Sequence, residues 1–227
     1  MTLLERFLHP ATVSLKICGV TSRDDAQKLV ELGVDALGVN FWPESKRYLA
    51  PEHAAWLLGM AGKILRVGVF VNSPPEVPLR LFREGLLDAV QLHGDESPRE
   101  AEIYHHHDVP FFKAFGVKTR DALECAMDFS ATAILLDAHA PGIYGGTGET
   151  FDWSVAVDFK SRHPDTPLIL AGGITADNAA TAAGIVRPAA LDVASGAELS
   201  PGTKDFRKVA ALLAALKNED GKVQDAK

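Results

Sequence analysis

The sequence is poor in cysteine and has no long hydrophobic run. Cys18 and Cys125 are its only cysteines in 227 residues, too few to expect a disulfide framework in a chain of this length. No apolar segment approaches the roughly 18 residues of a membrane span, and no N-terminal stretch joins a basic start to a sustained apolar run. We therefore expect a cytoplasmic protein with reduced thiols and no membrane partner.

An excess of basic charge is also missing. The chain has 23 Lys and Arg against 30 Asp and Glu, a formal net charge of −7. Because nucleic acids attract basic surfaces, this balance disfavours a nucleic acid as the main partner. A small anion can still bind wherever the local groups are positive. The composition, 47% hydrophobic and 23% charged, is typical of a globular domain that needs neither disulfide nor metal to hold a core.

Eight short apolar runs alternate with longer amphipathic segments along the chain. Such runs are typical of parallel strands buried on both faces. The runs are Val13–Ile17, Ala36–Asn40, Ile64–Val71, Ala89–Leu92, Phe111–Phe115, Ala133–Asp137, Leu168–Ala171 and Leu191–Ala194. Hydroxyl side chains stand where three of the amphipathic segments begin, at Ser22, Ser97 and Thr175, and each is a plausible helix N-cap.

Eight strand–helix units in about 205 residues predict an α/β fold, a single-domain (β/α)8 TIM barrel. A doubly wound open sheet is the alternative, since it uses the same alternation with fewer strands. No linker or change in composition divides the chain. We place the catalytic barrel at residues 13–217, an N-terminal lead-in at 1–12, and a charged tail, expected to be disordered, at 218–227.

The active site of such a barrel lies at the carboxyl ends of its strands. Cys18 stands at the end of the first predicted strand and is either a small core residue or a reactive thiolate. Lys16 projects to the same side of that strand and could lower the thiol pKa or orient the sulfur. Asp137 ends the sixth run, where burial would raise its pKa toward a general-acid role; a cap or a surface salt bridge is the alternative.

Glycine-rich loops follow the last three predicted strands. Glycine lets backbone N–H groups approach an anion closely, and barrels commonly hold phosphate in the loops after strands seven and eight. Each glycine pair alone could simply form a turn, but together the loops predict a phosphate site formed by Gly145, Gly146, Gly172, Gly173, Ser195 and Gly196.

Three further polar features are less specific. Arg47, in the loop after the second strand, either binds a carboxylate through its guanidinium fork or is simply solvated. His93 follows the fourth strand, where pocket-shaping, catalysis and loop structure are comparable interpretations. The run His105-His106-His107 lacks the spacing of a metal site, so we expect no metal. Cys125 is expected to be packed or half-buried.

Taken together, seven ordered segments between about residue 13 and residue 216 resemble the phosphoribosylanthranilate isomerases of tryptophan biosynthesis. The segments are Lys16-Ile17-Cys18-Gly19-Val20-Thr21, Val67-Gly68-Val69-Phe70-Val71-Asn72, Val90-Gln91-Leu92-His93-Gly94, Gly145-Gly146-Thr147-Gly148 with Phe151-Asp152-Trp153, Leu170-Ala171-Gly172-Gly173-Ile174, Asp192-Val193-Ala194-Ser195-Gly196 and Gly202-Thr203-Lys204-Asp205. The chain departs from the family at Lys46, where proline is common, and at Ala194, where a second serine is common.

The resemblance implies a cofactor-free and metal-free barrel that performs an Amadori rearrangement of N-(5-phosphoribosyl)anthranilate. By motif, Cys18 falls on the general base of the family, Asp137 on the general acid, and Arg47 on the arginine that holds the anthranilate carboxylate. The expected partner is a small phosphorylated substrate. The expected assembly is a monomer or a homodimer.

Three alternatives stay open at this point. A related isomerase of histidine biosynthesis would be expected to have two catalytic aspartates, but Cys18 stands at the first position. Indole-glycerol-phosphate synthase would be expected to have a catalytic lysine, and Lys16 and Lys113 lack its surrounding motif. A phosphate-binding barrel without activity is the third alternative, and the presence of Cys18 and Asp137 argues against it.

Overall fold

The first and last strands of the sheet pair with each other, which closes it into a barrel. The computed structural model describes residues 1–117, 123, 125–138 and 152–224. Ser14 to Ile17 lie in parallel register with Ala190 to Val193, and the strand order is β1 through β8 around the ring. The strands are β1 Ser14–Ile17, β2 Ala36–Asn40, β3 Leu65–Phe70, β4 Ala89–Leu92, β5 Phe111–Val117, β6 Ala133–Ala138, β7 Leu168–Leu170 and β8 Ala190–Val193.

Closure confirms the predicted barrel and excludes the open sheet, whose edge strands would stay unpaired. Each of the eight apolar runs overlaps a strand, with ends that differ by at most two residues. The strands are buried almost throughout, because side chains on one face fill the barrel and those on the other pack under the helices.

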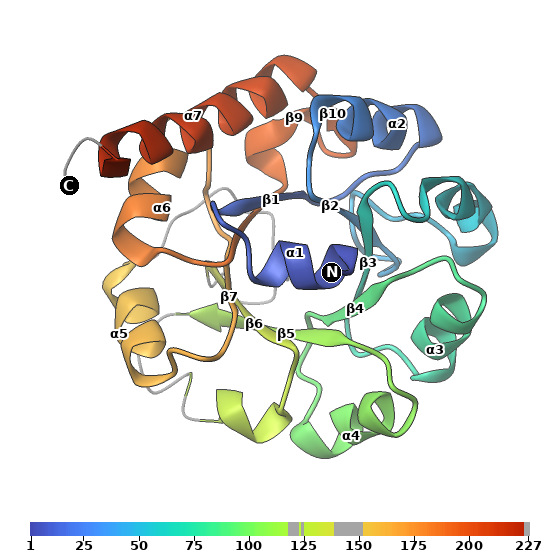
Figure 1. Ribbon diagram of the computed structural model, residues 1–227. Coiled ribbons are helices and arrows are strands. Elements are labelled where there is room, and N and C mark those ends of the chain that lie inside the picture. Colours follow the sequence, from blue (N-terminus) through green and yellow to red (C-terminus); the bar gives the residue numbers. More distant parts are fainter. Residues whose placement is uncertain (118–122, 124, 139–151, 225–227) are drawn as a thin grey trace.

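Helices surround the barrel in chain order (Figure 1). They are α2 Arg23–Leu32, the 3₁₀ helix η1 Pro51–Met60, α3 Glu76–Arg83, α4 Pro98–His106, the 3₁₀ helix η3 Ala126–Phe129, α5 Ser154–Arg162, α6 Ala179–Val186 and α7 Phe206–Gln224. Ser22 caps α2 by accepting from the Asp25 N–H, and Ser97 caps α4 in a reciprocal capping box with Glu100. These two predicted caps are confirmed.

The predicted cap at Thr175 is wrong. Helix α6 begins later, at Ala179, and has no side-chain cap. The Asn178 amide oxygen instead accepts from the Thr175 N–H at 2.8 Å, and its amide nitrogen donates to the Gly173 carbonyl at 2.9 Å. The Asn178 and Ala179 N–H groups donate to the Thr175 carbonyl, so a hydrogen-bonded turn held by the Asn178 side chain precedes the helix.

The chain after β8 contains more regular secondary structure than the sequence indicated. Helix α7 continues to Gln224, past the predicted end of the barrel domain at residue 217. The segment is poor in apolar residues, but no proline interrupts it, so the backbone hydrogen bonds can continue. A hairpin of β9 Glu198–Ser200 and β10 Thr203–Lys204 also follows β8, after the short 3₁₀ helix η4 Ser195–Ala197.

The lead-in forms a helix, α1 Leu3–Leu8, that lies across the open end of the barrel (Figure 1). Thr2 and Glu5 form a capping box at its start, a signal that the sequence carries as Thr-x-x-Glu. Phe7 and Leu8 are 1% and 5% exposed and belong to the cluster that fills the barrel interior. Phe7 stacks on Phe112 of β5 with ring centroids 6.2 Å apart. Helix α1 thus closes the amino-terminal end of the core.

Removing the Phe7 ring should destabilise the whole barrel. For Phe7→Ala we expect a loss of about 3–5 kcal/mol in the free energy of unfolding, the usual cost of emptying a buried phenylalanine site. The matched control is Ile185→Ala on α6, whose side chain is 54% exposed, with a change within about 0.5 kcal/mol. Urea denaturation measures both, and equal effects would show that the core does not depend on α1.

Candidate active site

The carboxyl ends of the strands bring most of the predicted site residues to one end of the barrel. Cys18 directly follows β1, Asp137 lies near the end of β6, and Arg47 lies in the loop after β2. The pairs Gly172-Gly173 and Ser195-Gly196 follow β7 and β8. The eight strands of the barrel run in parallel, so their carboxyl ends share one rim. The predicted glycines Gly145 and Gly146 lie outside the described residues.

Cys18 lies among positively charged groups. Its N–H donates to the Val193 carbonyl at 2.8 Å, and its own carbonyl accepts from the Lys204 ammonium at 2.5 Å. The residue is half-buried. Burial raises the pKa of the Cys18 thiol, and Lys16, the strongest of the cations that oppose this rise, offsets it only in part.

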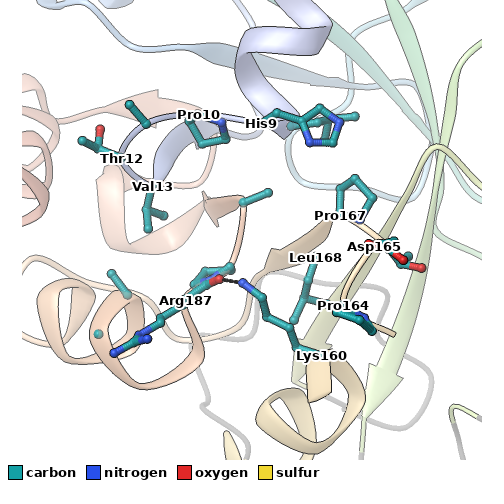
Figure 2. A pocket seen from close by; sticks show the side chains of 17 residues that line it. His9, Pro10, Thr12, Val13, Lys160, Pro164, Asp165, Pro167, Leu168 and Arg187 are labelled. Atoms are coloured by element: carbon teal, nitrogen blue, oxygen red, sulfur yellow. Dashed lines mark hydrogen bonds between the residues drawn. The ribbon is translucent and has the colours of Figure 1, made fainter. Parts of the chain in front are cut away.

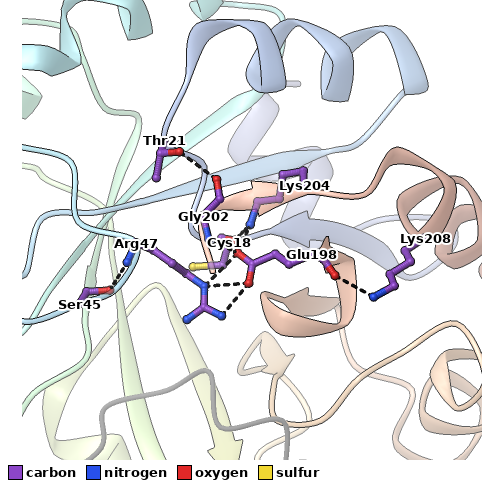
Figure 3. Close-up of polar contacts among 8 residues, drawn as sticks. All are labelled: Cys18, Thr21, Ser45, Arg47, Glu198, Gly202, Lys204 and Lys208. Carbon is purple, nitrogen blue, oxygen red and sulfur yellow. Dashed lines mark hydrogen bonds and ion pairs between the residues drawn. The ribbon is translucent and has the colours of Figure 1, made fainter. Parts of the chain in front are cut away.

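A three-residue charge network lies beside Cys18 (Figure 3). Arg47 donates through Nε to Glu198 Oε1 at 2.9 Å and through Nη2 to Glu198 Oε2 at 2.7 Å. Lys204 donates to Glu198 Oε1 at 2.7 Å. Burial tends to raise the pKa of the Glu198 carboxyl, but its bonds to Arg47 and Lys204 outweigh burial, so the pKa is lowered.

This network was not expected from the sequence. Arg47 was predicted to use its guanidinium fork on a substrate carboxylate, whereas in this structure the fork holds Glu198. Glu198 and Lys204 lie on β9 and β10, and neither was a candidate site residue. The dipeptide Pro201-Gly202 between the two strands is a turn signal that could have revealed the hairpin.

Asp137 lies in a different environment from Cys18. Its Oδ1 accepts from the Ala138 N–H at 2.8 Å, and its Oδ2 lies 3.4 Å from His93 Nε2. The other ring nitrogen of His93, Nδ1, is 2.7 Å from Gln91 Nε2. Gln91 is fully buried, and its Oε1 has no partner among the described residues. His93 therefore contacts the predicted acid directly and is itself oriented by a buried amide.

Gly172 packs closely against the Asp137 carboxyl group. Its φ of +83° is in the left-handed region, and a Cβ there would lie 2.6 Å from the Ala138 nitrogen and 3.0 Å from Asp137 Oδ1. A side chain would therefore displace the carboxyl group. This requirement for glycine is independent of any phosphate.

The loops after β7 and β8 lie against each other. A Cβ on Gly196 would overlap the Ile174 carbonyl oxygen, so glycine is needed for this close approach of two backbones. Gly172, Gly173, Ser195 and Gly196 are all half-buried. The four residues form a partly open backbone surface between β6 and β1, which is the geometry that an anion site requires.

A separate cavity of about 850 Å³ lies at the opposite end of the barrel. Its walls come from the segment after α1 and from the residues that precede β7 and β8. Figure 2 shows the Lys160 side chain reaching across it to the Arg187 carbonyl, to which it donates a hydrogen bond. Because Cys18 and Asp137 lie at the other rim, this cavity is not the candidate active site.

Both cysteines are free, and Cys125 is exposed. The expectation of a packed or half-buried Cys125 is thus wrong, since η3 begins only after it and leaves it at the surface. Within the described ranges, no three His, Cys, Asp or Glu side chains are grouped so as to hold a metal ion. No helix in the same ranges is long and apolar enough to cross a membrane.

The lowered pKa of Glu198 predicts a pH-dependent stability. A carboxyl whose pKa is lower in the folded state stabilises the fold above its unfolded pKa of about 4.3 and loses this contribution as pH falls. Glu198→Gln leaves Arg47 and Lys204 without their carboxylate, so we expect a loss of about 3–5 kcal/mol at pH 7. The difference from wild type should shrink below pH 4.3 or so.

Urea denaturation across this pH range measures the effect. The control is Glu31→Gln, which removes an exposed ion pair with Lys28 and should leave stability unchanged. A Glu198→Gln protein as stable as wild type at pH 7 would mean that the network does not stabilise the fold.

The chain matches known proteins over most of its length. Residues 15–215 match the family model described as N-(5'-phosphoribosyl)anthranilate (PRA) isomerase. The N-(5'-phosphoribosyl)anthranilate isomerase of Trichlorobacter lovleyi is 42% identical over 198 residues, which cover 87% of this chain and 94% of that protein.

Solved structures agree with the sequence match. The phosphoribosyl anthranilate isomerase of Thermotoga maritima superposes with a TM-score of 0.82 at 38% identity, covering 91% of this chain and 99% of that one. A similar isomerase, solved with reduced 1-(o-carboxyphenylamino)-1-deoxyribulose 5-phosphate, has a TM-score of 0.79 at 36% identity and the same two coverages. The chain therefore belongs to the N-(5'-phosphoribosyl)anthranilate isomerase family.

Proposed function

We propose that this chain catalyses the Amadori rearrangement of N-(5-phosphoribosyl)anthranilate to 1-(2-carboxyphenylamino)-1-deoxyribulose 5-phosphate, with Cys18 as general base and Asp137 as general acid. Membership of the family makes the chain an isomerase of tryptophan biosynthesis. The roles of individual residues are what the proposal adds. These roles rest on one observation: Asp137 and Cys18 lie at the ends of strands on either side of the two glycine loops that follow β7 and β8.

The order of strands around the barrel supports this arrangement. Asp137 is on β6 and Cys18 follows β1, and β7 and β8 lie between these two strands. A phosphate held by the loops after β7 and β8 would place the attached sugar between the carboxyl group and the sulfur. The two groups could then act on different atoms of one bound substrate.

The chemistry assigns one step to each group. Protonated Asp137 would donate to the furanose ring oxygen, so that the ring opens to a Schiff base. Asp137 Oδ1 accepts a backbone hydrogen bond, and Oδ2 lies 3.4 Å from His93 Nε2. Cys18, as thiolate, would then remove the proton from C2, and the resulting enolamine tautomerises to the ketone.

Arg47 is assigned to the anthranilate carboxylate of the substrate. Its Nε and Nη2 are bonded to Glu198, and this pairing holds the guanidinium plane in place. Nη1 is then the nitrogen that would donate to the substrate. Only 12% of the Arg47 side chain is exposed, so the substrate would meet a cation whose position is already fixed.

The phosphate of the substrate is assigned to Gly172, Gly173, Ser195 and Gly196, together with the predicted glycines Gly145 and Gly146. The related Thermotoga maritima isomerase is described as dimeric. For this chain a monomer and a homodimer both remain compatible with the proposal, because the described site residues all belong to one barrel.

Substitution of the acid and of the base should each abolish most turnover. General acid–base groups of this kind contribute about 10²–10⁴-fold each, so we expect losses of that size in kcat for Cys18→Ala and Asp137→Asn. The assay follows the fluorescence of freshly prepared N-(5-phosphoribosyl)anthranilate. Cys125→Ser is the matched control, since this exposed thiol lies outside the site, and should keep wild-type turnover.

The outcomes separate the reaction from the residue roles. Turnover by wild type that persists unchanged in Cys18→Ala would remove the assigned base. A folded wild-type protein without turnover would contradict the proposed reaction and favour another sugar-phosphate barrel or an inactive phosphate-binding one.

The phosphate site can be tested without turnover. A ligand that binds only the folded state at 100 times its Kd stabilises that state by about 2.7 kcal/mol. We therefore expect inorganic phosphate or a pentose 5-phosphate to raise the melting temperature, with sodium chloride at equal ionic strength as control. If neither phosphate compound raised it, the assignment of the glycine loops would be wrong.

A further inference from the structure

A fully buried ammonium group lies beside Cys18 inside the barrel. Lys16 is 0% exposed and forms a salt bridge with Asp192 Oδ2 at 2.8 Å. The two residues are direct partners in the register that closes the barrel between β1 and β8. The second oxygen of Asp192, Oδ1, has no partner among the described residues.

The neighbouring strand leaves room for this group next to the sulfur. A Cβ on Gly38 of β2 would lie 2.8 Å from Cys18 Sγ and 3.0 Å from Lys16 Nζ. Both atoms therefore border the space that a side chain at position 38 would occupy. The ammonium and the sulfur are also close enough for each to change the pKa of the other.

We propose that Lys16, anchored by Asp192, is a positioning residue that stabilises the thiolate form of the Cys18 sulfur, and that Gly38 provides the space in which the two groups meet. This inference rests on the proposed role of Cys18 as the base.

The charged groups around the sulfur support this role. Three cations interact with Cys18, namely Lys16, Lys204 and Arg47. Two carboxylates accompany them: Asp192 pairs with Lys16, and Glu198 serves both Arg47 and Lys204. Asp25 also interacts with Lys204, so the carboxylates balance the cations, and Lys16 is the cation with the largest effect on the thiol.

Lys16 differs from the other buried lysine in this cluster. Burial lowers the pKa of Lys204, and its contacts with Glu198 do not fully offset this. Burial also tends to lower the pKa of Lys16, but Asp192 and the Cys18 sulfur outweigh it, so the pKa of Lys16 is raised. Lys16 thus keeps its charge to higher pH and is the more dependable partner of a thiolate.

The test measures the thiol directly, in the absence of substrate. In a Cys125→Ser background, the rate of alkylation of Cys18 by iodoacetamide is followed against pH. Because Lys16→Met alone would leave the buried Asp192 carboxylate unpaired, the comparison is between Asp192→Asn and the double variant Lys16→Met/Asp192→Asn. Circular dichroism confirms that each protein is folded.

The two changes should move the alkylation midpoint in opposite directions. Asp192→Asn removes a negative charge that raises the pKa of the thiol, so its midpoint should fall below that of the background protein. Adding Lys16→Met should then raise the midpoint by about 1–3 pH units, the usual effect of losing one close opposite charge. A purely structural role for Lys16 would not produce opposite shifts.

Gly38→Ala gives a second, independent readout. The added methyl group should separate the ammonium from the sulfur and raise the midpoint, whereas Gly59→Ala, where a Cβ meets nothing within 4 Å, should leave it unchanged. Equal midpoints in the Asp192→Asn protein and the double variant, both folded, would overturn the proposal. That result would leave the isomerase assay of Cys18→Ala unaffected, so a failure here is distinguishable from a failure of the proposed function.

Discussion

The pairing of β1 with β8 is the constraint on which the rest of the structure depends. It removes the exposed edges of the sheet and sets Lys16 opposite Asp192. A shift of one residue would turn these side chains to the other face, among the apolar residues that pack under the helices. The hydrogen-bond register of the backbone therefore decides where charge can be buried in this barrel. The β9–β10 hairpin then adds Glu198 and Lys204 beside Cys18.

Burying so many charges is compatible with a stable fold because each has an opposite partner. Taking an ion out of water costs several kcal/mol unless a counter-ion and hydrogen bonds compensate for it. Lys16 has Asp192, while Arg47 and Lys204 share Glu198. The amino-terminal half of the barrel contains the opposite kind of interior, an apolar cluster closed by Phe7 and Leu8 of α1. The apolar residues that stabilise the core and the charged residues around Cys18 thus lie at opposite ends of the barrel.

The two titratable groups of the proposed mechanism experience opposite surroundings. Cys18 is surrounded by ammonium and guanidinium groups, whereas Asp137 contacts a backbone N–H and the imidazole of His93. Gly172 and Gly38 contribute by what they lack, since a Cβ at either position would approach one of these two groups within 3.0 Å.

The sequence by itself determined the eight strands and most of the helices, because hydrophobic periodicity is a local property. The order of these elements along the chain also indicated the rim to which Cys18, Asp137 and the described glycines belong. The sequence also indicated that Lys16 could affect the pKa or the orientation of the Cys18 thiol. Only the tertiary structure decided that Asp192 anchors Lys16, that Arg47 is bonded to Glu198, and that His93 contacts Asp137. These contacts join residues up to 176 positions apart, and such pairings follow from barrel closure and strand register, which no local pattern encodes.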